Sequence, residues 1–176
     1  MKNHIEFCKE KPKIYVACLA AYNNGYLHGE WIDAHQDLDD LYAEIKKILA
    51  SSPISNAEEW AMHDYEGFGD VTINEYTDLE TVTALASFIV EHDELGAGVL
   101  AHVDGDIDEA TRLLEECYHG EYGSEEEFAE SFAEDTMTIP EHLSYYIDYE
   151  KMARDWFISD FFSIEINRKT HVFSNC

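Results

Sequence analysis

The first third of the chain alternates short apolar runs with turn residues, a pattern typical of a small antiparallel sheet. Residues 14–21 and 26–33 are partly β-branched and aromatic, and Asn24-Gly25 lies between them. Because Asn-Gly is the strongest short hairpin signal, the two runs are predicted to pair as antiparallel strands. Apolar residues then recur at helical spacing, which predicts a helix over 37–50.

The rest of the chain is mainly helical by the same criterion, and the mixture of strands and helices indicates the α+β class. Ser124 and Glu127 form a capping box, in which the serine bonds the amide of Glu127 and the glutamate reaches back to the amide of Ser124. The pattern predicts a strand over 60–65 and helices over 78–94, 106–117 and 124–136, with a short apolar piece after Gly96 and Gly98, up to Val103. It then predicts a helix with Pro140 in its first turn, a helix over 149–159, and a closing hairpin of 161–166 and 171–173.

The charge is concentrated in one part of the chain. The formal net charge is −27 in 176 residues, yet residues 1–47 carry −2 and residues 151–176 carry +1. Residues 48–150 hold 27 acidic side chains against the single Arg112, a net charge of −26. With 13% aromatic residues the chain is unlike a disordered acidic tail. The middle segment is therefore a folded anionic surface, which disfavours binding to nucleic acid and favours a basic partner.

The helix predicted over 124–136 indicates how such a surface is built. Phe128 and Phe132 share one face, while Glu126, Glu130 and Glu134 form a row about 160–240° around the helix axis from them. The row repeats a carboxylate every ~6 Å, whereas each strand of B-DNA carries a phosphate every ~3.4 Å. Imitation of a duplex therefore needs several helices side by side. In total charge, the middle segment equals the phosphates of about 13 base pairs.

Other interpretations of the acidic segment stay open. It could be a solvated acidic face, or a salt-adapted surface, although the near-neutral ends argue against the latter. Asp104, Asp106, Asp108 and Glu115 have the spacing of positions 1, 3, 5 and 12 of a calcium-binding EF-hand loop. That loop requires glycine at position 6, where Glu109 stands, so the calcium interpretation is disfavoured.

Motifs of catalytic or metal-binding chemistry are not present in the sequence. It contains no HExxH, P-loop, GxGxxG or Gly-x-Ser-x-Gly, so we assign no catalytic residue, metal or cofactor. Cys8, Cys18, Cys117 and Cys176 lack CxxC spacing and are expected to be free thiols in a reducing compartment. Without a recognisable signal peptide or an apolar stretch of membrane-spanning length, we expect a cytoplasmic protein.

Several segments resemble the ArdA antirestriction family, from about residue 14 to residue 173. The resemblance is carried by the order and spacing of these segments together. An N-terminal extension over residues 1–13, with 4 Lys and 2 Glu, departs from the family pattern. The matching stretches are Tyr15–Ala17, Tyr22–Gly25, Gly29–Trp31, His63–Phe68, Leu114–Thr136, Ile139–Glu141, Tyr146–Glu150 and Ala153–Asp155.

The resemblance implies an elongated DNA mimic that is encoded on mobile elements. Members of the family occupy the DNA groove of type I restriction-modification enzymes, chiefly the methyltransferase core, and they are not enzymes. The family also implies three small subdomains, which here correspond to residues 1–69, 70–103 and 104–176. The antirestriction motif of the family falls on residues 114–134.

A homodimer is the second implication of the resemblance. In the family the C-terminal subdomain forms the dimer contact, and Tyr118, Tyr122 and Phe128 are the candidates for it. Ordinary packing in the core is the other interpretation of these three aromatic side chains.

Charge and resemblance together predict which side chains meet the lysines and arginines of the partner. The alternative is an acidic adaptor that binds a basic protein without competing for DNA. The carboxylates predicted to mimic phosphates belong to Glu80, Glu91, Glu94, Asp104, Asp106, Asp108, Glu115, Glu126, Glu130 and Glu134.

Overall fold

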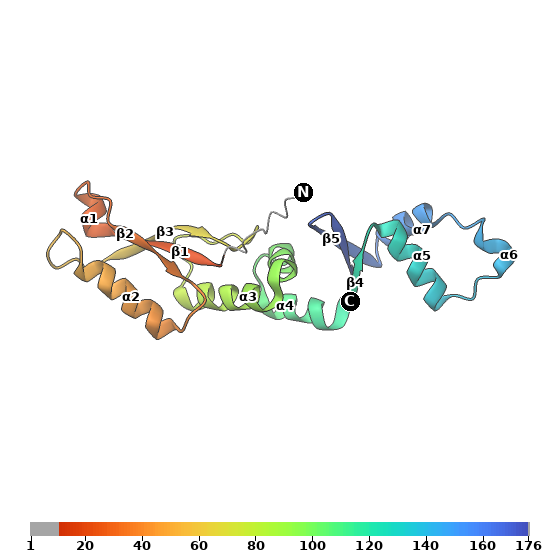
Figure 1. Ribbon diagram of the computed structural model, residues 1–176, viewed down its shortest axis with the longest axis horizontal. Coiled ribbons are helices and arrows are strands. Elements are labelled where there is room, and N and C mark those ends of the chain that lie inside the picture. Colours follow the sequence, from red (N-terminus) through yellow and green to blue (C-terminus); the bar gives the residue numbers. More distant parts are fainter. Residues whose placement is uncertain (1–10, 176) are drawn as a thin grey trace, which may run out of the picture. The chain divides into compact units, whose positions relative to one another are not determined.

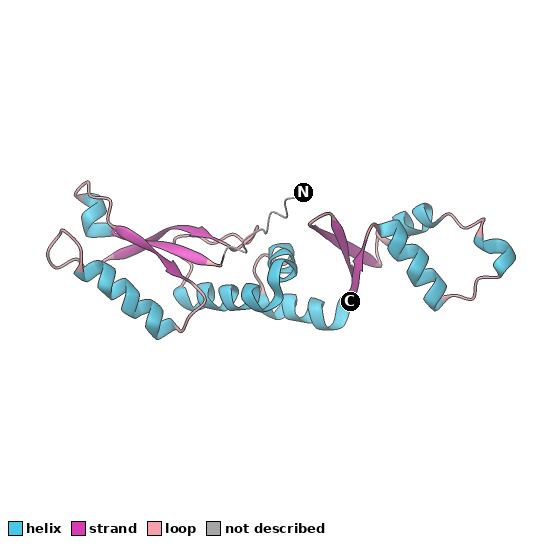
Figure 2. Ribbon diagram, in the orientation of Figure 1, coloured by secondary structure: helices cyan, strands magenta, loops and turns pink. Residues whose placement is uncertain are grey.

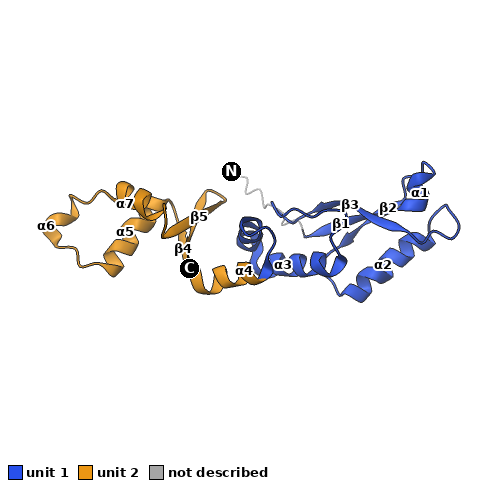
Figure 3. Cartoon of the chain, turned by 180° about the vertical axis from the view of Figure 1, so that it is seen from behind, with its two compact units in different colours: residues 1–107 blue, residues 108–176 orange. Residues whose placement is uncertain are grey.

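The computed structural model describes residues 11–175, and its internal contacts divide the chain into two compact units (Figure 1, Figure 3). Unit 1 comprises residues 1–107 and unit 2 comprises residues 108–176. Each unit combines helices with a three-stranded antiparallel sheet, so the predicted α+β class is confirmed (Figure 2). The division into three subdomains stays a prediction. Within residues 11–175, no helix has the length and apolar character needed to cross a membrane.

The sheet of unit 1 is built around β1 (Lys13–Cys18). This strand lies between β2 (Gly29–Asp33) and β3 (Trp60–Glu66), and both neighbours run antiparallel to it. Ile14 and Val16 on β1 are fully buried, as expected for one face of an alternating strand. The predicted pairing of the first two strands and the predicted strand over 60–65 are therefore confirmed.

The connection between β1 and β2 differs from the predicted tight hairpin. Residues Leu19–Asn23 form a short helix, α1, and Gly25 follows it at φ 81°. The run that starts at Leu19 is rich in alanine and leucine, which are good helix formers. Asn24-Gly25 therefore turns the chain at the end of a helix instead of joining two strands directly.

Two long helices complete unit 1. α2 (Leu38–Ala50) has the predicted extent and buries one apolar face. α3 (Leu79–His102) begins after its cap Asp78 and continues through the glycine-containing segment beyond residue 94, where the predicted helix ends. It breaks at Asp93, which has φ 59° and ψ −147°, so that two helical parts follow one another.

A Schellman turn ends α3. The amide of Gly105 donates to the carbonyl of Leu100 at 2.8 Å, and Asp104 adopts φ 52°, the left-handed conformation that this turn requires. The next helix begins as α4 (Ile107–Arg112) and continues as a π-helix, η1 (Leu113–Cys117). The predicted helix over 106–117 is thus confirmed in extent, but its second half has π geometry.

The sheet of unit 2 has β6 (Lys169–Ser174) at its centre, between β4 (Tyr118–Tyr122) and β5 (Phe161–Ile166). Asn167 and Arg168 join β5 to β6 with φ 51° and 63°, as a type I′ hairpin turn requires. The predicted closing hairpin is therefore confirmed. The sequence did not predict β4, which is an edge strand of this sheet in the described part of the chain.

α5 (Glu125–Thr136) and α7 (Tyr149–Trp156) pack against each other beside this sheet. Between them in the sequence lies the short α6 (Glu141–Ser144), for which Pro140 is the cap residue rather than part of the first turn. The core of unit 2 is aromatic: it contains Phe128, Phe161 and Val172, against which Tyr122, Phe132, Trp156 and Phe157 pack.

The cap of α5 matches the predicted capping box in one of its two bonds. Ser124 Oγ accepts a hydrogen bond from the Glu127 amide at 3.1 Å, as predicted. The Glu127 carboxylate accepts from the amide of Gly123 at 2.7 Å, one residue before the expected amide of Ser124. The box therefore also fixes the chain that leads from β4 into α5.

The cysteines differ from the expectation of four free thiols. Cys117 is disulfide-bonded, so the expectation is wrong for this residue. Cys18 is a buried free thiol whose Sγ lies 3.3 Å from Ser52 Oγ. Cys8 and Cys176 lie outside the described residues. Spacing along the sequence failed as a guide because it does not report which cysteines come together in space.

Candidate functional site

α5 carries a row of carboxylates on the face that its core residues leave in water. Glu126, Glu130 and Glu134 are exposed, while Phe128 on the other side of the helix has no exposed surface. The spacing of the aromatic residues fixes this arrangement, because burial of one helix face leaves the residues opposite it in solvent. The predicted row is therefore present.

The charge of this row acts on the neighbouring helix. Burial raises the pKa of Tyr149, the first residue of α7, and the negative charges of Glu134 and Glu130 raise it further. A phenol that is harder to ionise is the expected response to nearby anions. The charges of Glu130 and Glu134 therefore reach the first residue of α7.

The remaining predicted carboxylates lie on α3, on the turn after it, and on the helix that follows. All of them are exposed, as are the three on α5. Unit 1 contributes five of the ten and unit 2 contributes the other five. In unit 1 they are Glu80, Glu91, Glu94, Asp104 and Asp106, and in unit 2 they are Asp108, Glu115, Glu126, Glu130 and Glu134.

Other acids of the middle segment have structural roles. Asp78 caps α3: its carboxylate accepts from the amide of Thr81 at 2.8 Å and from the Thr81 hydroxyl at 2.9 Å. These hydrogen bonds lower the pKa of Asp78. Glu125 accepts from Ser163 Oγ at 2.7 Å and so links α5 to β5. Such acids therefore hold local structure in place as well as adding negative charge.

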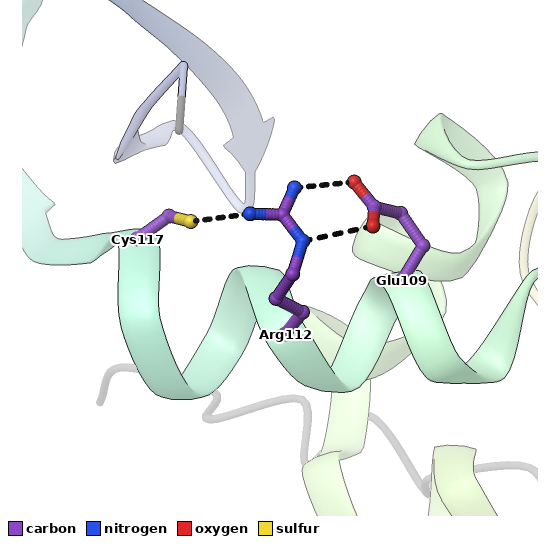
Figure 4. A network of polar contacts seen from close by, with 3 residues as sticks. All are labelled: Glu109, Arg112 and Cys117. Atoms are coloured by element: carbon purple, nitrogen blue, oxygen red, sulfur yellow. Dashed lines mark hydrogen bonds and ion pairs between the residues drawn. The ribbon is translucent and has the colours of Figure 1, made fainter.

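The only cation among residues 48–150 is bound within its own helix. Arg112 Nε and Nη2 donate to the two carboxylate oxygens of Glu109 at 2.9 and 2.6 Å, and Nη1 lies 3.6 Å from the Cys117 sulfur (Figure 4). The hydrogen bond from Arg112 lowers the pKa of Glu109. A bidentate pair of this kind fixes the guanidinium in one orientation. The charge of Arg112 is therefore offset by Glu109, which is not among the ten predicted carboxylates.

The calcium interpretation conflicts with the backbone. An EF-hand needs an irregular loop through its first nine positions, but the chain is helical from Ile107, which would be the fourth position. Among residues 11–175, no group of three or more potential ligands is arranged to hold a metal ion. The spacing of Asp104, Asp106 and Asp108 is therefore that of exposed acids at the start of a helix.

The aromatic residues predicted for the dimer contact have packing roles within unit 2. The Tyr118 hydroxyl and His171 Nδ1 are hydrogen-bonded at 2.7 Å, and the two rings stack. The Tyr122 ring meets Phe128 edge-on with the centroids 5.2 Å apart. Phe128 is fully buried, whereas Tyr118 and Tyr122 on the edge strand β4 are half-buried. The structure contains one chain, so a dimer contact by these residues stays a prediction.

Two histidines of this sheet are held by aromatic packing. The ring of His119 meets Phe128, Phe132 and Phe161 with centroids 5.3–5.6 Å apart, and burial lowers its pKa. Burial also lowers the pKa of His171, against an opposite effect of the Glu121 charge. Both side chains therefore favour the neutral form, and their contacts are those of packing residues.

The sequence of the chain also matches a known protein family. A family model described as "Antirestriction protein (ArdA)" matches residues 14–167. The chain belongs to the ArdA family. This ArdA match runs through both units and includes all ten of the predicted carboxylates. ArdA proteins are non-enzymatic inhibitors directed at restriction-modification enzymes. The chain matches none of the curated proteins.

Proposed function

We propose that this protein imitates duplex B-DNA with its exposed carboxylates and occupies the DNA-binding groove of type I restriction-modification enzymes, chiefly the methyltransferase core. Membership of the ArdA family supports an antirestriction role. One observation carries the mimicry: all ten predicted carboxylates are exposed, while the single cation of residues 48–150 is bound to Glu109.

The mechanism is competition for a basic groove. Lysines and arginines that bind phosphates in the DNA complex would meet these carboxylates instead. Opposite fields steer the encounter, so association is fast at low salt and slows as the Debye length falls from about 10 Å at 0.1 M. Because many carboxylates share the interaction, removal of one of them weakens inhibition without abolishing it.

A homodimer is part of the proposal, because one chain offers the charge of only about 13 base pairs. The edge position of β4 supports a contact there, since an edge strand presents unpaired backbone groups to another chain. Tyr118 and Tyr122 lie on this strand, and Phe128 supports Tyr122 from the core. Division of each chain into three subdomains, over 1–69, 70–103 and 104–176, is proposed with it.

The test is competition with unmodified duplex DNA for a type I methyltransferase core. The wild-type protein should displace DNA, and a triple variant in which Glu126, Glu130 and Glu134 become glutamine should compete less well and with a weaker dependence on salt. A control variant removes three exposed acids from the near-neutral N-terminal segment, through Glu30→Gln, Asp39→Asn and Asp40→Asn. It should compete like the wild type.

Restriction in cells provides the second measurement. Unmodified phage should plate more efficiently on a restricting host that produces the protein. If the protein binds the enzyme but leaves DNA binding intact, the acidic adaptor is the correct description. An unchanged plating efficiency across several type I families would refute the antirestriction mechanism for this chain.

A further inference from the structure

Unit 2 carries an exposed apolar segment between α5 and α7, over residues 137–147. In Figure 1 this segment, with α6 in its middle, loops out beyond the ends of the two helices that it joins. Tyr145 is 96% exposed and Tyr146 is 83% exposed, and Met137 and Leu143 are each 46% exposed. Four large apolar or aromatic side chains thus lie in solvent within eleven residues.

The fold does not account for these tyrosines. The core of unit 2 is complete without them, because neither Tyr145 nor Tyr146 belongs to the aromatic cluster around Phe128. The segment is nevertheless ordered by local bonds: the amide of Leu143 donates to the Pro140 carbonyl at 2.8 Å, and the amide of Tyr146 donates to the Leu143 carbonyl at 2.9 Å. The two rings are therefore presented to solvent on a defined turn.

The surroundings of the segment are anionic. Glu134 and Asp135 precede it, Glu141 lies within it and Asp148 follows it, and there is no Lys or Arg between Arg112 and Lys151. An aromatic centre within a charged rim is the usual composition of a protein interface, and tyrosine is among the residues that contribute most to binding. A second copy of this chain would bring a rim of the same sign against it. A basic partner would be complementary.

We propose that Tyr145 and Tyr146 are aromatic anchors for the restriction-modification enzyme, and that they enter the part of its groove that contacts bases while the flanking carboxylates meet the residues that contact phosphates. This inference rests on the proposed function. A tyrosine ring offers a flat π face, as a base does, on which the arginine and aromatic side chains of a nucleic-acid groove can stack. The partner is thus a groove with basic walls and an apolar or stacking floor.

The experiment uses the full chain with Tyr145 and Tyr146 both replaced by alanine, in the DNA competition assay at about 0.1 M and about 0.5 M salt. We expect affinity to fall by about tenfold or more at both salt concentrations, because salt does not screen the contact of an apolar anchor. The dependence on salt should stay that of the wild type, since every carboxylate is retained. A double change to phenylalanine should keep most of the affinity, because the rings remain.

Two controls separate the possible outcomes. The melting temperature of the double alanine variant should equal that of the wild type, since both side chains are exposed. Tyr76→Ala removes a tyrosine that is 87% exposed in unit 1, and it should have no effect on affinity. An equal loss in this control would show that exposed tyrosines act without regard to position, which overturns the inference.

Three further results would be decisive. Unchanged competition by the double alanine variant, alongside effective competition by the wild type, overturns the inference and leaves the proposed function standing. A wild-type protein that does not displace DNA overturns both. If light scattering shows a dimer for the wild type and a monomer for the double alanine variant, the two tyrosines contact a second copy of the chain. That result would contradict the inference.

Discussion

The carboxylate row of α5 should lower the stability of unit 2, and Glu130→Gln measures by how much. Glu130 lies in the middle of α5 with Glu126 and Glu134 four residues to either side, and all three are exposed. Each like-charge pair at this spacing costs about 0.2–0.5 kcal/mol, so loss of two pairs should stabilise the helix by about 0.4–1.0 kcal/mol. Glutamine has nearly the helix propensity of glutamate, and the dipole of the helix acts only on its end turns.

The assay is thermal unfolding at low salt and at about 1 M salt, where the Debye length falls to about 3 Å. For a unit of about 70 residues, the expected gain raises the melting temperature by about 2–8 °C at low salt, and by much less at high salt. The pKa of Tyr149 should fall in the same variant, because Glu130 is one of the charges that raise it. Inhibition should be weakened only slightly.

Glu126→Gln is the matched control. It removes one like-charge pair, but it also removes a carboxylate from the first turn of α5, where the helix dipole favours negative charge by about 0.3–1 kcal/mol. We therefore expect no gain in stability or a small loss. Three results would contradict this account: a Glu130→Gln variant no more stable than the wild type, a gain that persists undiminished in 1 M salt, or an equal gain in Glu126→Gln.

Three further predictions concern stability. Ser124→Ala removes the side-chain bond to the start of α5 and should cost about 1 kcal/mol in chemical denaturation, whereas Ser131→Ala on the same helix should cost less. Because burial lowers the pKa of His119 and His171, the unfolded chain binds more protons than the folded chain below about pH 6.5. The melting temperature of unit 2 should therefore fall as pH falls toward 5, and it should fall less in a His171→Gln variant. The φ and ψ of Asp93 suit glycine, so the Asp93→Gly variant should be more stable than Asp93→Ala by about 1 kcal/mol or more, the reverse of the order in an ordinary helix. Equal stabilities of the two variants would show that the backbone at this position is not strained.

Periodicity predicted the longer helices of this fold well, because they bury apolar side chains that recur every three or four residues. It failed where glycine is used for packing. Gly96 is buried inside α3, where a Cβ would lie 2.6 Å from the Cβ of His92. This glycine therefore avoids a clash with His92 and does not end the helix. The same failure hid the continuation of α3 to His102.

β4 shows a second limit. Its residues alternate only weakly, and its pairing partner β6 lies about fifty residues later in the sequence. Local pattern cannot report such a long-range contact, so the sequence does not predict the strand on which Tyr118 and Tyr122 lie. The exposed carboxylates were easier to predict, because residues opposite a buried helix face are necessarily in solvent. Tyr145 and Tyr146 could not be recognised from sequence, since an aromatic side chain is usually buried.

In α5 the residues that build the core and those that carry the charge are different residues, and the phenylalanines lie opposite the glutamates. Phe128, Ala129 and Ala133 are buried, and Glu126, Glu130 and Glu134 have no part in that packing. Substitutions on the outer row are therefore nearly free of steric constraint. Under selection by changing host enzymes, such a protein can revise the pattern of charge that it displays, one side chain at a time, while its fold is inherited intact.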